Sequence, residues 1–232
     1  MAINVETLKT RALTALVFVA VMLVGLLLNL WSFIILFTVI HFGCWYEFVK
    51  LIKKIYADQY LKYCLFGLAY ITMPVLMMLN LGIEWKIYTI NNTNELIYNK
   101  LLPCTILFSI WINDTMAYLV GSMIGKTPFS KISPKKTWEG TAGGAVLCVT
   151  VIGLLANFIP VAKQIVIQHW VAIAAICGIF GTIGDLLESK LKRMANVKDS
   201  GSIMPGHGGF LDRFDSLLIA VPFVWLYVKL FI

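Results

Sequence analysis

Charged residues are scarce in this sequence. Asp, Glu, Lys and Arg make up 13% of the 232 residues, whereas 59% are hydrophobic. Soluble domains carry about 25% charged residues, so this composition excludes an ordinary soluble domain. Apolar runs of about 20 residues recur along the chain and are long enough to cross a hydrocarbon layer of ~30 Å. We therefore predict a polytopic membrane protein, whose net charge of +7 reflects topology and attraction to anionic lipid rather than nucleic-acid binding.

Cysteine is also sparse, and its spacing excludes the usual metal and disulfide frameworks. The five cysteines lie inside apolar runs, and no pair has the separation of zinc ligands. We interpret them as small buried hydrophobic residues. The sequence has no small-residue cleavage site after the polar start MAINVETLKTR. We therefore expect the first apolar run to be retained as a span.

The apolar runs predict an all-α transmembrane bundle of about seven spans. The first two spans are separated at LNLW, because an apolar run of more than thirty residues exceeds one bilayer crossing. We interpret residues 1–100 as an N-terminal region with three spans and residues 101–232 as a C-terminal transmembrane region, with a polar loop from Gly82 to Lys100. The predicted spans are about 12–29, 31–49, 63–81, 101–123, 141–159, 169–188 and 214–232.

The basic residues predict the orientation of these spans. With the N-terminus in the cytoplasm, four basic residues fall on the outer side and the other 15 of the 19 on the inner side. This distribution fits the positive-inside rule. The polar loops 124–140 and 189–213 then face the cytoplasm, where soluble nucleotides can reach them. The four outer residues are Lys86, Lys100, Lys163 and Lys229.

Acidic residues at the ends of the last two predicted spans form the first candidate site. Asp185 and Glu188 are three residues apart, as are Asp212 and Asp215, so each pair shares one helix face. A helix-cap role for Asp212 and Asp215 is an open alternative, because carboxylates are favourable at helix N-termini. Converging carboxylates repel one another unless a cation binds, and hard oxygen ligands without a His or Cys cluster favour Mg²⁺.

The segment that joins these two spans carries groups that bind phosphate. It includes the stretch KDSGSIMPGHGGFLDRFDS, residues 198–216, whose basic residues, serine and glycine amides suit an anion. A topogenic, lipid-facing role is the alternative for the basic residues. The spacing leaves open whether His207 is a phosphate donor, a general acid or an ordinary loop residue. The phosphate-binding candidates are Lys190, Lys192, Arg193, Lys198, Ser200, Gly206, Gly208 and Gly209.

A second polar loop follows the fourth predicted span. Asp114 lies well inside that span, where a carboxylate is costly and marks a functional site. The stretch SPKKTWEG then places Ser133, Lys135 and Lys136 at the cytoplasmic surface. This loop therefore repeats the combination of acidic, basic and glycine residues found between the last two spans.

These motifs together resemble the signature of the phosphatidate cytidylyltransferases, or CDP-diacylglycerol synthases. SKLKRMANVKDSGSIMPGHGGFLDRFDS contains Ser-x-apolar-Lys-Arg, then Lys-Asp after four residues, and His-Gly-Gly and Asp-Arg-x-Asp after a spacer. The upstream DTMAYLVGSMIGK and SPKKTWEG are similar to the second conserved block of the family. The resemblance begins at Asp114 and covers the C-terminal half of the chain. The matching signature residues are Ser189, Lys192, Arg193, Lys198, Asp199, His207, Gly208, Gly209, Asp212, Arg213 and Asp215.

The resemblance implies transfer of the cytidylyl group of CTP to phosphatidic acid at the cytoplasmic face of a bacterial inner membrane. It implies Mg²⁺ bound by Asp185, Asp212 and Asp215, with Lys198 and His207 as further catalytic residues. The expected partners are CTP, phosphatidic acid and membrane lipid, without nucleic acid, and a homodimer is compatible with the sequence. The expected substrate contacts are Asp114, Ser133, Lys135, Lys136, Arg193, Ser200, Gly208, Gly209 and Arg213.

Three alternatives compete with this interpretation. A transporter could use Asp114 and Glu47 as an ion relay, but most charge lies in the loops and the two halves of the sequence are not alike. An enzyme that consumes CDP-diacylglycerol would carry a different aspartate motif, which is absent from this sequence. A CTP-dependent transferase acting on another lipid phosphate or a polyprenol stays open.

Overall fold

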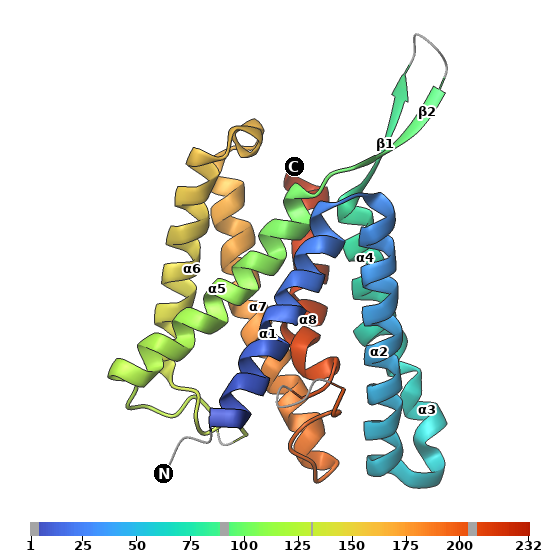
Figure 1. Ribbon diagram of the computed structural model, residues 1–232, viewed down its shortest axis with the longest axis vertical. Helices are drawn as coiled ribbons and strands as arrows, with labels where there is room; N and C mark the ends of the chain where they lie inside the picture. The colour runs from blue at the N-terminus through green and yellow to red at the C-terminus, as the bar shows by residue number, and fades with distance from the viewer. Residues whose placement is uncertain (1–4, 89–92, 131, 204–207) are drawn as a thin grey trace.

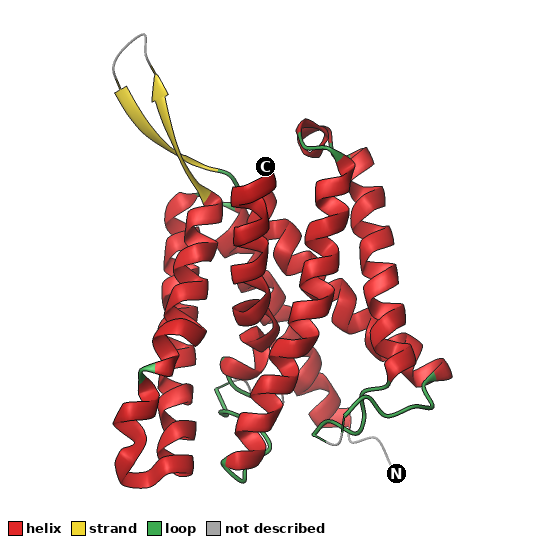
Figure 2. Cartoon of the chain, turned by 180° about the vertical axis from the view of Figure 1, so that it is seen from behind, coloured by secondary structure: helices red, strands yellow, loops and turns green. Residues whose placement is uncertain are grey.

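The structure, a computed structural model, describes residues 5–88, 93–130, 132–203 and 208–232. Its helices run up and down one bundle, and a single hairpin projects from one end (Figures 1 and 2). The predicted helical membrane bundle is therefore confirmed. In chain order the elements are α1 (Val5–Leu27), α2 (Leu30–Tyr56), η1 (Ala57–Gln59), α3 (Tyr60–Cys64), η2 (Leu68–Thr72), α4 (Met73–Gly82), β1 (Ile83–Tyr88), β2 (Thr93–Tyr98), α5 (Leu101–Ile124), α6 (Trp138–Phe158), η3 (Pro160–Gln164), α7 (Ile167–Met194) and α8 (Leu211–Phe231).

The predicted break between the first two helices is present and has a local cause. Asn29 caps α2, accepting a hydrogen bond from the Ser32 amide at 2.9 Å. The Ser32 hydroxyl accepts one in return from the Asn29 amide at 3.1 Å. This reciprocal capping satisfies amides that have no partner inside the helix. The chain can therefore turn within the apolar run.

The third predicted span is an interrupted helix. A π-helical turn, η2, lies between α3 and α4. The Thr72 hydroxyl at the end of this turn contacts two side chains of α2: His41 Nε2 at 3.0 Å and Trp45 Nε1 at 2.9 Å. These contacts attach the irregular turn to α2.

The segment Gly82–Lys100 is not the predicted polar loop but an antiparallel hairpin of β1 and β2. Its β-branched and aromatic residues fit strands, which four-to-six-residue runs indicate only weakly in sequence. Two hydrogen bonds fix its base. The Tyr98 hydroxyl donates to the Leu26 carbonyl at 2.7 Å, and the Asn99 amide group donates to Glu84 Oε1 at 2.7 Å. The hairpin is an addition to the helical bundle that the sequence analysis did not predict.

Five helices in the described part of the chain are long and apolar enough to cross a membrane. Two shorter apolar helices accompany them, at Ala12–Leu27 and Leu68–Gly82. All seven predicted spans therefore coincide with apolar helices, but the number that cross the membrane stays a prediction. The five long spans are Leu30–Cys64, Leu101–Ile124, Trp138–Phe158, Ile167–Met194 and Leu211–Phe231.

Glycines allow the C-terminal helices to approach closely. A Cβ added at Gly184 of α7 would lie 2.4 Å from the Asp215 carbonyl oxygen of α8. A Cβ added at Gly140 of α6 would lie 2.7 Å from the Ala117 carbonyl oxygen of α5. Small residues at helix crossings bring backbones together in this way in membrane proteins. The close contact of α7 with α8 places Asp185 beside Asp215.

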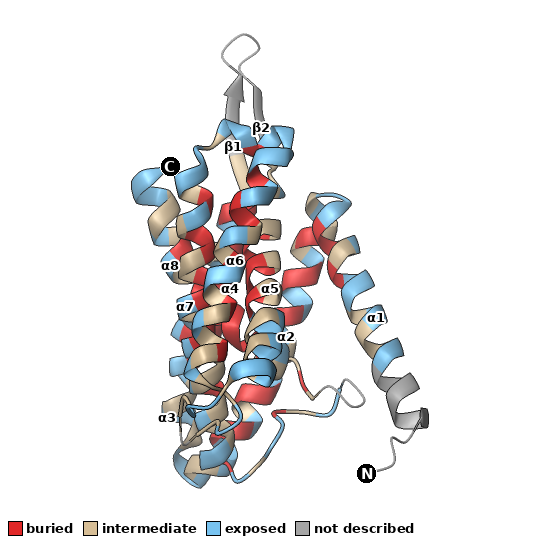
Figure 3. Cartoon of the chain, turned by 90° about the vertical axis from the view of Figure 1, so that its left-hand side faces the viewer, coloured by how far each residue is buried: buried red, intermediate tan, exposed pale blue. Residues whose placement is uncertain are grey.

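The polar loops gather at one end of the bundle. The buried residues run along its middle (Figure 3). The start of α1 and the described parts of loops 125–137 and 195–210 lie at one end, and the hairpin and the end of α8 lie at the other (Figure 1). The candidate site residues therefore converge on the end that carries the loops.

Candidate active site

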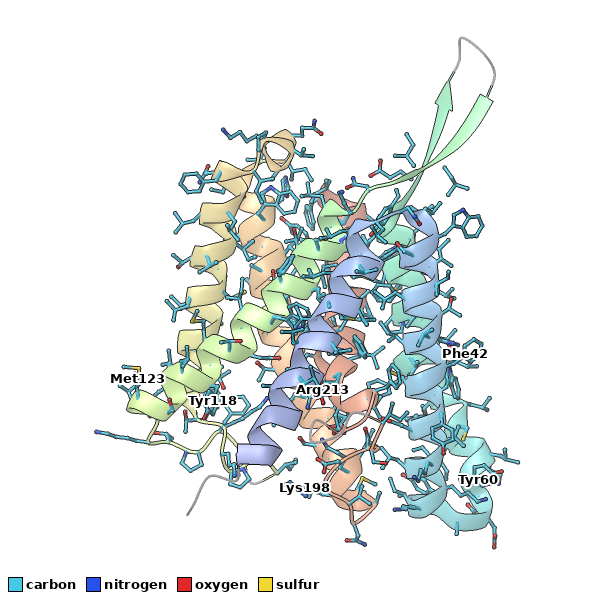
Figure 4. The ribbon with its side chains drawn as sticks, viewed as in Figure 1. Phe42, Tyr60, Tyr118, Met123, Lys198 and Arg213 are labelled. Carbon is cyan, nitrogen blue, oxygen red and sulfur yellow. The ribbon has the colours of Figure 1, made fainter. Side chains whose placement is uncertain are left out.

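A cavity of about 960 Å³ opens among α1, α5, α6, α7, α8 and the two polar loops. Phe18 and Trp111 form part of its apolar wall, and their rings are 6.2 Å apart. Lys198 of the second loop and Arg213 of α8 lie on the loop side of the bundle (Figure 4). Ten of the predicted site residues line this cavity: Asp114, Ser133, Lys135, Lys136, Asp185, Lys198, Gly208, Asp212, Arg213 and Asp215.

Five aspartates line this cavity, and three of them come from three different helices. Asp114 of α5, Asp185 of α7 and Asp215 of α8 all line it, and the negative charge of Asp215 interacts with those of the other two. Lys136 forms an ion pair with Asp185 and lessens the repulsion. Arg213 also interacts electrostatically with Asp114. The predicted proximity of Asp185 and Asp215 is thus present, with Asp114 as a third neighbour.

Asp212 has different surroundings from those three carboxylates. Its Oδ1 accepts from Lys192 Nζ at 2.6 Å, and Lys192 also pairs with the fully buried carboxylate of Glu188. Lys192 therefore joins the end of α7 to the start of α8. Its i,i+4 spacing from Glu188 is a sequence signal that could have revealed this ion pair, which the sequence analysis did not predict.

The other oxygen of Asp212 holds the second polar loop. Oδ2 accepts from the Ser200 amide and hydroxyl, each at 2.9 Å, and from the Gly209 amide at 2.8 Å. Gly208 has a φ of 82°, and a Cβ there would lie 2.5 Å from the same oxygen. Both the left-handed backbone and the close contact require glycine at this position.

The hydrogen bonds at the start of α8 show whether Asp212 and Asp215 are helix caps. The amides of Phe210 and Leu211 donate to Glu47 Oε1 and Oε2 at 3.0 and 2.9 Å. Asp215 instead accepts from the amide of its neighbour Ser216, at 2.6 Å, and Asp212 binds the loop before the helix. A carboxylate of α2 therefore caps α8.

The transporter alternative would use Glu47 and Asp114 as an ion relay. Of these two, only Asp114 is among the described residues that line the cavity.

The first polar loop is held by its own hydrogen bonds. The Phe129 amide donates to the Lys136 carbonyl at 2.7 Å, and the Trp138 amide donates to the Thr127 carbonyl at 3.0 Å. The Thr137 hydroxyl caps α6 by accepting from the Gly140 amide at 3.1 Å. This ladder places the lysine pair of the loop beside the cavity.

Four of the predicted site residues do not line the cavity in the described structure. Arg193 donates to the Val197 carbonyl at 3.5 Å in the adjoining turn. Ser200 and Gly209 bind Asp212 through the loop, as described above. His207 lies outside the described residues. The helix α7 extends to Met194, so residues 189–194 are helical rather than part of the predicted loop.

The sequence profile of the cytidylyltransferase family matches residues 65–231, which include all the aspartates of the cavity and both of its loops. The chain belongs to the cytidylyltransferase family. The predicted family resemblance is confirmed.

Curated relatives give the same assignment. The chain is 46% identical over 125 residues to the phosphatidate cytidylyltransferase of Bacillus subtilis, covering 53% of this chain and 45% of the relative. It is 44% identical over 117 residues to the chloroplastic phosphatidate cytidylyltransferase 4 of Arabidopsis thaliana, covering 50% and 29%. A Staphylococcus saprophyticus relative of the same name is 45% identical over 114 residues, covering 49% and 43%. The match thus spans less than half of each relative.

Proposed function

We propose that this chain transfers the cytidylyl group of CTP to phosphatidic acid, giving CDP-diacylglycerol and pyrophosphate. The observation that carries this proposal is the convergence of ten of the predicted site residues on one cavity. The family assignment supports cytidylyl transfer, and the names of the relatives support phosphatidate as the acceptor.

The charges of the cavity suit two polyanionic substrates. Lys135, Lys136, Lys198 and Arg213 line it, and cations of this kind hold phosphates by charge-assisted hydrogen bonds. The loop that carries Lys198 would hold the nucleotide phosphates, and the lysine pair of the first loop would hold the lipid phosphate or the pyrophosphate. The apolar wall at Phe18 and Trp111 would contact the lipid part.

The carboxylates of the cavity fit Mg²⁺ bound together with substrate phosphates. The described residues contain no group of three His, Cys, Asp or Glu side chains arranged to hold a metal by themselves. Mg²⁺ commonly binds through one or two carboxylates plus phosphate oxygens and water, and Asp185 and Asp215 supply such a pair. Asp212, the third ligand implied by the resemblance, would have to exchange a hydrogen bond for the metal. When bound, Mg²⁺ neutralises phosphate charge and acts as a Lewis acid.

The reaction needs positioning more than proton transfer. A phosphate oxygen of phosphatidic acid attacks the α-phosphorus of CTP, a new P–O bond forms, and the bond to the β-phosphate breaks to release pyrophosphate. The attacking phosphate has a second pKa of ~6 and is ionised at neutral pH, so no strong general base is required. The lysines and Arg213 would reduce the repulsion between the substrates and hold them in line.

The proposal includes seven membrane crossings with the active site at the cytoplasmic face of a bacterial inner membrane. Both polar loops and the start of α1 lie at one end of the bundle. That end carries the lysines of both loops, as the positive-inside rule expects for a cytoplasmic side. CTP would reach the cavity from the cytoplasm, and phosphatidic acid from the adjoining leaflet.

The test is a transfer assay with the purified protein. CTP labelled at the α-phosphate is mixed with Mg²⁺ and vesicles that contain phosphatidic acid, and label in the lipid phase is counted. Vesicles that contain diacylglycerol instead are the control, because they lack the attacking phosphate. We expect label only with phosphatidic acid. Transfer to a polyprenyl phosphate but not to phosphatidic acid would contradict the proposed acceptor.

A further inference from the structure

Glu47 of α2 is a buried carboxylate that contacts the second polar loop. Its exposed fraction is 1%. It accepts from the Ser200 hydroxyl at 2.6 Å, the Phe210 amide at 3.0 Å and the Leu211 amide at 2.9 Å. These donors lie on both sides of the segment that carries Gly208 and Gly209. One side chain therefore holds both ends of the loop.

The loop backbone lies directly against the Glu47 carboxylate at two glycines. A Cβ added at Gly201 would lie 2.1 Å from Glu47 Oε1, and one added at Gly209 would lie 2.2 Å from both carboxylate oxygens. Real Cβ atoms essentially never approach so closely. The loop backbone therefore packs directly on the carboxylate, and any larger residue would push the loop away from α2.

A carboxylate suits this place better than a neutral side chain. The start of a helix has amides without intrahelical partners and a partial positive charge, both of which favour an anion. Glu47 provides two oxygens that accept from three donors there. The Ser200 hydroxyl oxygen also lies 2.9 Å from Asp212 Oδ2, so Glu47 of α2 and Asp212 of α8 share the single hydrogen of this hydroxyl.

We infer that Glu47 is a positioning residue of the active site, which anchors the Ser200–Gly201 turn and the first turn of α8. The inference rests on the proposed function for its effect on turnover. Glu47 precedes the segment matched by the family profile, residues 65–231, and is not among the described residues that line the cavity. It acts through the loop, whose Lys198 and Gly208 do line the cavity.

The first test compares Glu47→Gln with Ile40→Ala. Glutamine keeps one acceptor oxygen but places an NH₂ group against a donor, so at least one backbone amide loses its partner. Ile40 is buried on the same helix, 1% exposed and two turns earlier, and its apolar side chain accepts no hydrogen bond from the loop. Hydrogen exchange of peptides covering residues 208–216 should quicken roughly tenfold in Glu47→Gln. It should stay near the native rate in Ile40→Ala.

Turnover adds a readout that a merely structural residue would not move. For Glu47→Gln, kcat should fall by ~10–100-fold because the loop is misplaced. KM for CTP should rise as well, because the displaced loop carries Lys198, which would hold the nucleotide phosphates. KM for phosphatidic acid should change by less than about threefold, because Lys135 and Lys136 lie in the other loop. Ile40→Ala, measured per folded molecule, should keep its kcat. A native kcat with unchanged exchange in Glu47→Gln would overturn the inference.

The second test asks whether removing the Glu47 side chain relieves the steric clash that Gly201→Ala introduces. Gly201→Ala should lower the unfolding temperature and quicken loop exchange, since its Cβ meets Glu47. In a Glu47→Ala background the same change should add little, because the colliding oxygens are gone. Additive effects would overturn the inference. If the native protein forms no CDP-diacylglycerol, the proposed function fails, while exchange and unfolding temperature still decide whether Glu47 anchors the loop.

Discussion

Asp212→Asn should lower both stability and turnover, and the contacts of Asp212 set the size of each effect. The change removes the charge that faces Lys192 and turns one acceptor oxygen into an NH₂ group. That group must then face either the ammonium or the donors of Ser200 and Gly209. A buried donor left without its partner costs about 1–3 kcal/mol. A simple helix cap would lose only a few tenths of a kcal/mol in the same substitution, because asparagine caps well.

Asp185→Asn is the matched comparison. The ion pair of Asp185 with Lys136 is partly exposed, with side-chain exposures of 30% and 27%, so its loss should cost less than about 1 kcal/mol. If both aspartates bind Mg²⁺, each substitution should lower turnover by ~10²–10³-fold. The double variant should lose much less than the product of the two, since both would serve one ion.

The assay measures two quantities for each variant. Unfolding temperature in detergent reports stability, and CDP-diacylglycerol formation across a Mg²⁺ titration reports the metal. Near-normal turnover in folded Asp212→Asn protein would refute a metal role for Asp212 and leave it as the anchor of the loop. A native unfolding temperature would refute the hydrogen-bond argument. Loss of stability in Asp185→Asn as large as in Asp212→Asn would refute the distinction between the two surroundings.

Three further predictions concern the loops and the topology. Replacing Lys135 and Lys136 together with Gln should lower turnover with phosphatidic acid; a change within about twofold, ~0.4 kcal/mol, would make them topogenic charges only. Gly208→Ala should cost about 1–2 kcal/mol from its positive φ alone, and an unchanged unfolding temperature would contradict the conformation of this turn. Single cysteines introduced in 93–98 and 127–130 should react with an impermeant reagent from opposite sides of the membrane. Labelling from the same side would exclude seven crossings.

The helices were predictable because the membrane imposes a simple rule on the sequence. Each crossing needs a long apolar run, and the predicted spans 101–123 and 141–159 lie within a few residues of α5 and α6. The hairpin was not predictable, because short alternating runs beside a polar tip resemble a loop. The extension of α7 to Met194 was also missed. The basic residues there were assigned to a loop, although they favour the end of a helix.

Some residues of the candidate site were likewise predictable from the sequence, and others were not. Asp114, Asp185 and Asp215 could be found because polar groups at membrane depth need a functional account. Lys192 was one of several lysines in the sequence, and its contact with both Glu188 and Asp212 appears only when α7 and α8 are packed together. Long-range packing, rather than local spacing, decides which of several similar residues holds the site.

Glu47 shows this dependence on long-range packing most clearly. It belongs to the predicted region 1–100 and contacts residues of the predicted region 101–232. It is separated by 153 residues from Ser200 and by 164 from Leu211, so no periodic pattern could indicate the contact. Trp225 of α8 likewise donates to Asn80 of α4 at 2.8 Å, and Phe18 of α1 lies 6.0 Å from Phe214 between ring centres. The family signature supplies the charged groups of the cavity. Phe18 of the apolar wall and the loop anchor Glu47 come from the first two helices, so the geometry of the site depends on residues that no motif marks.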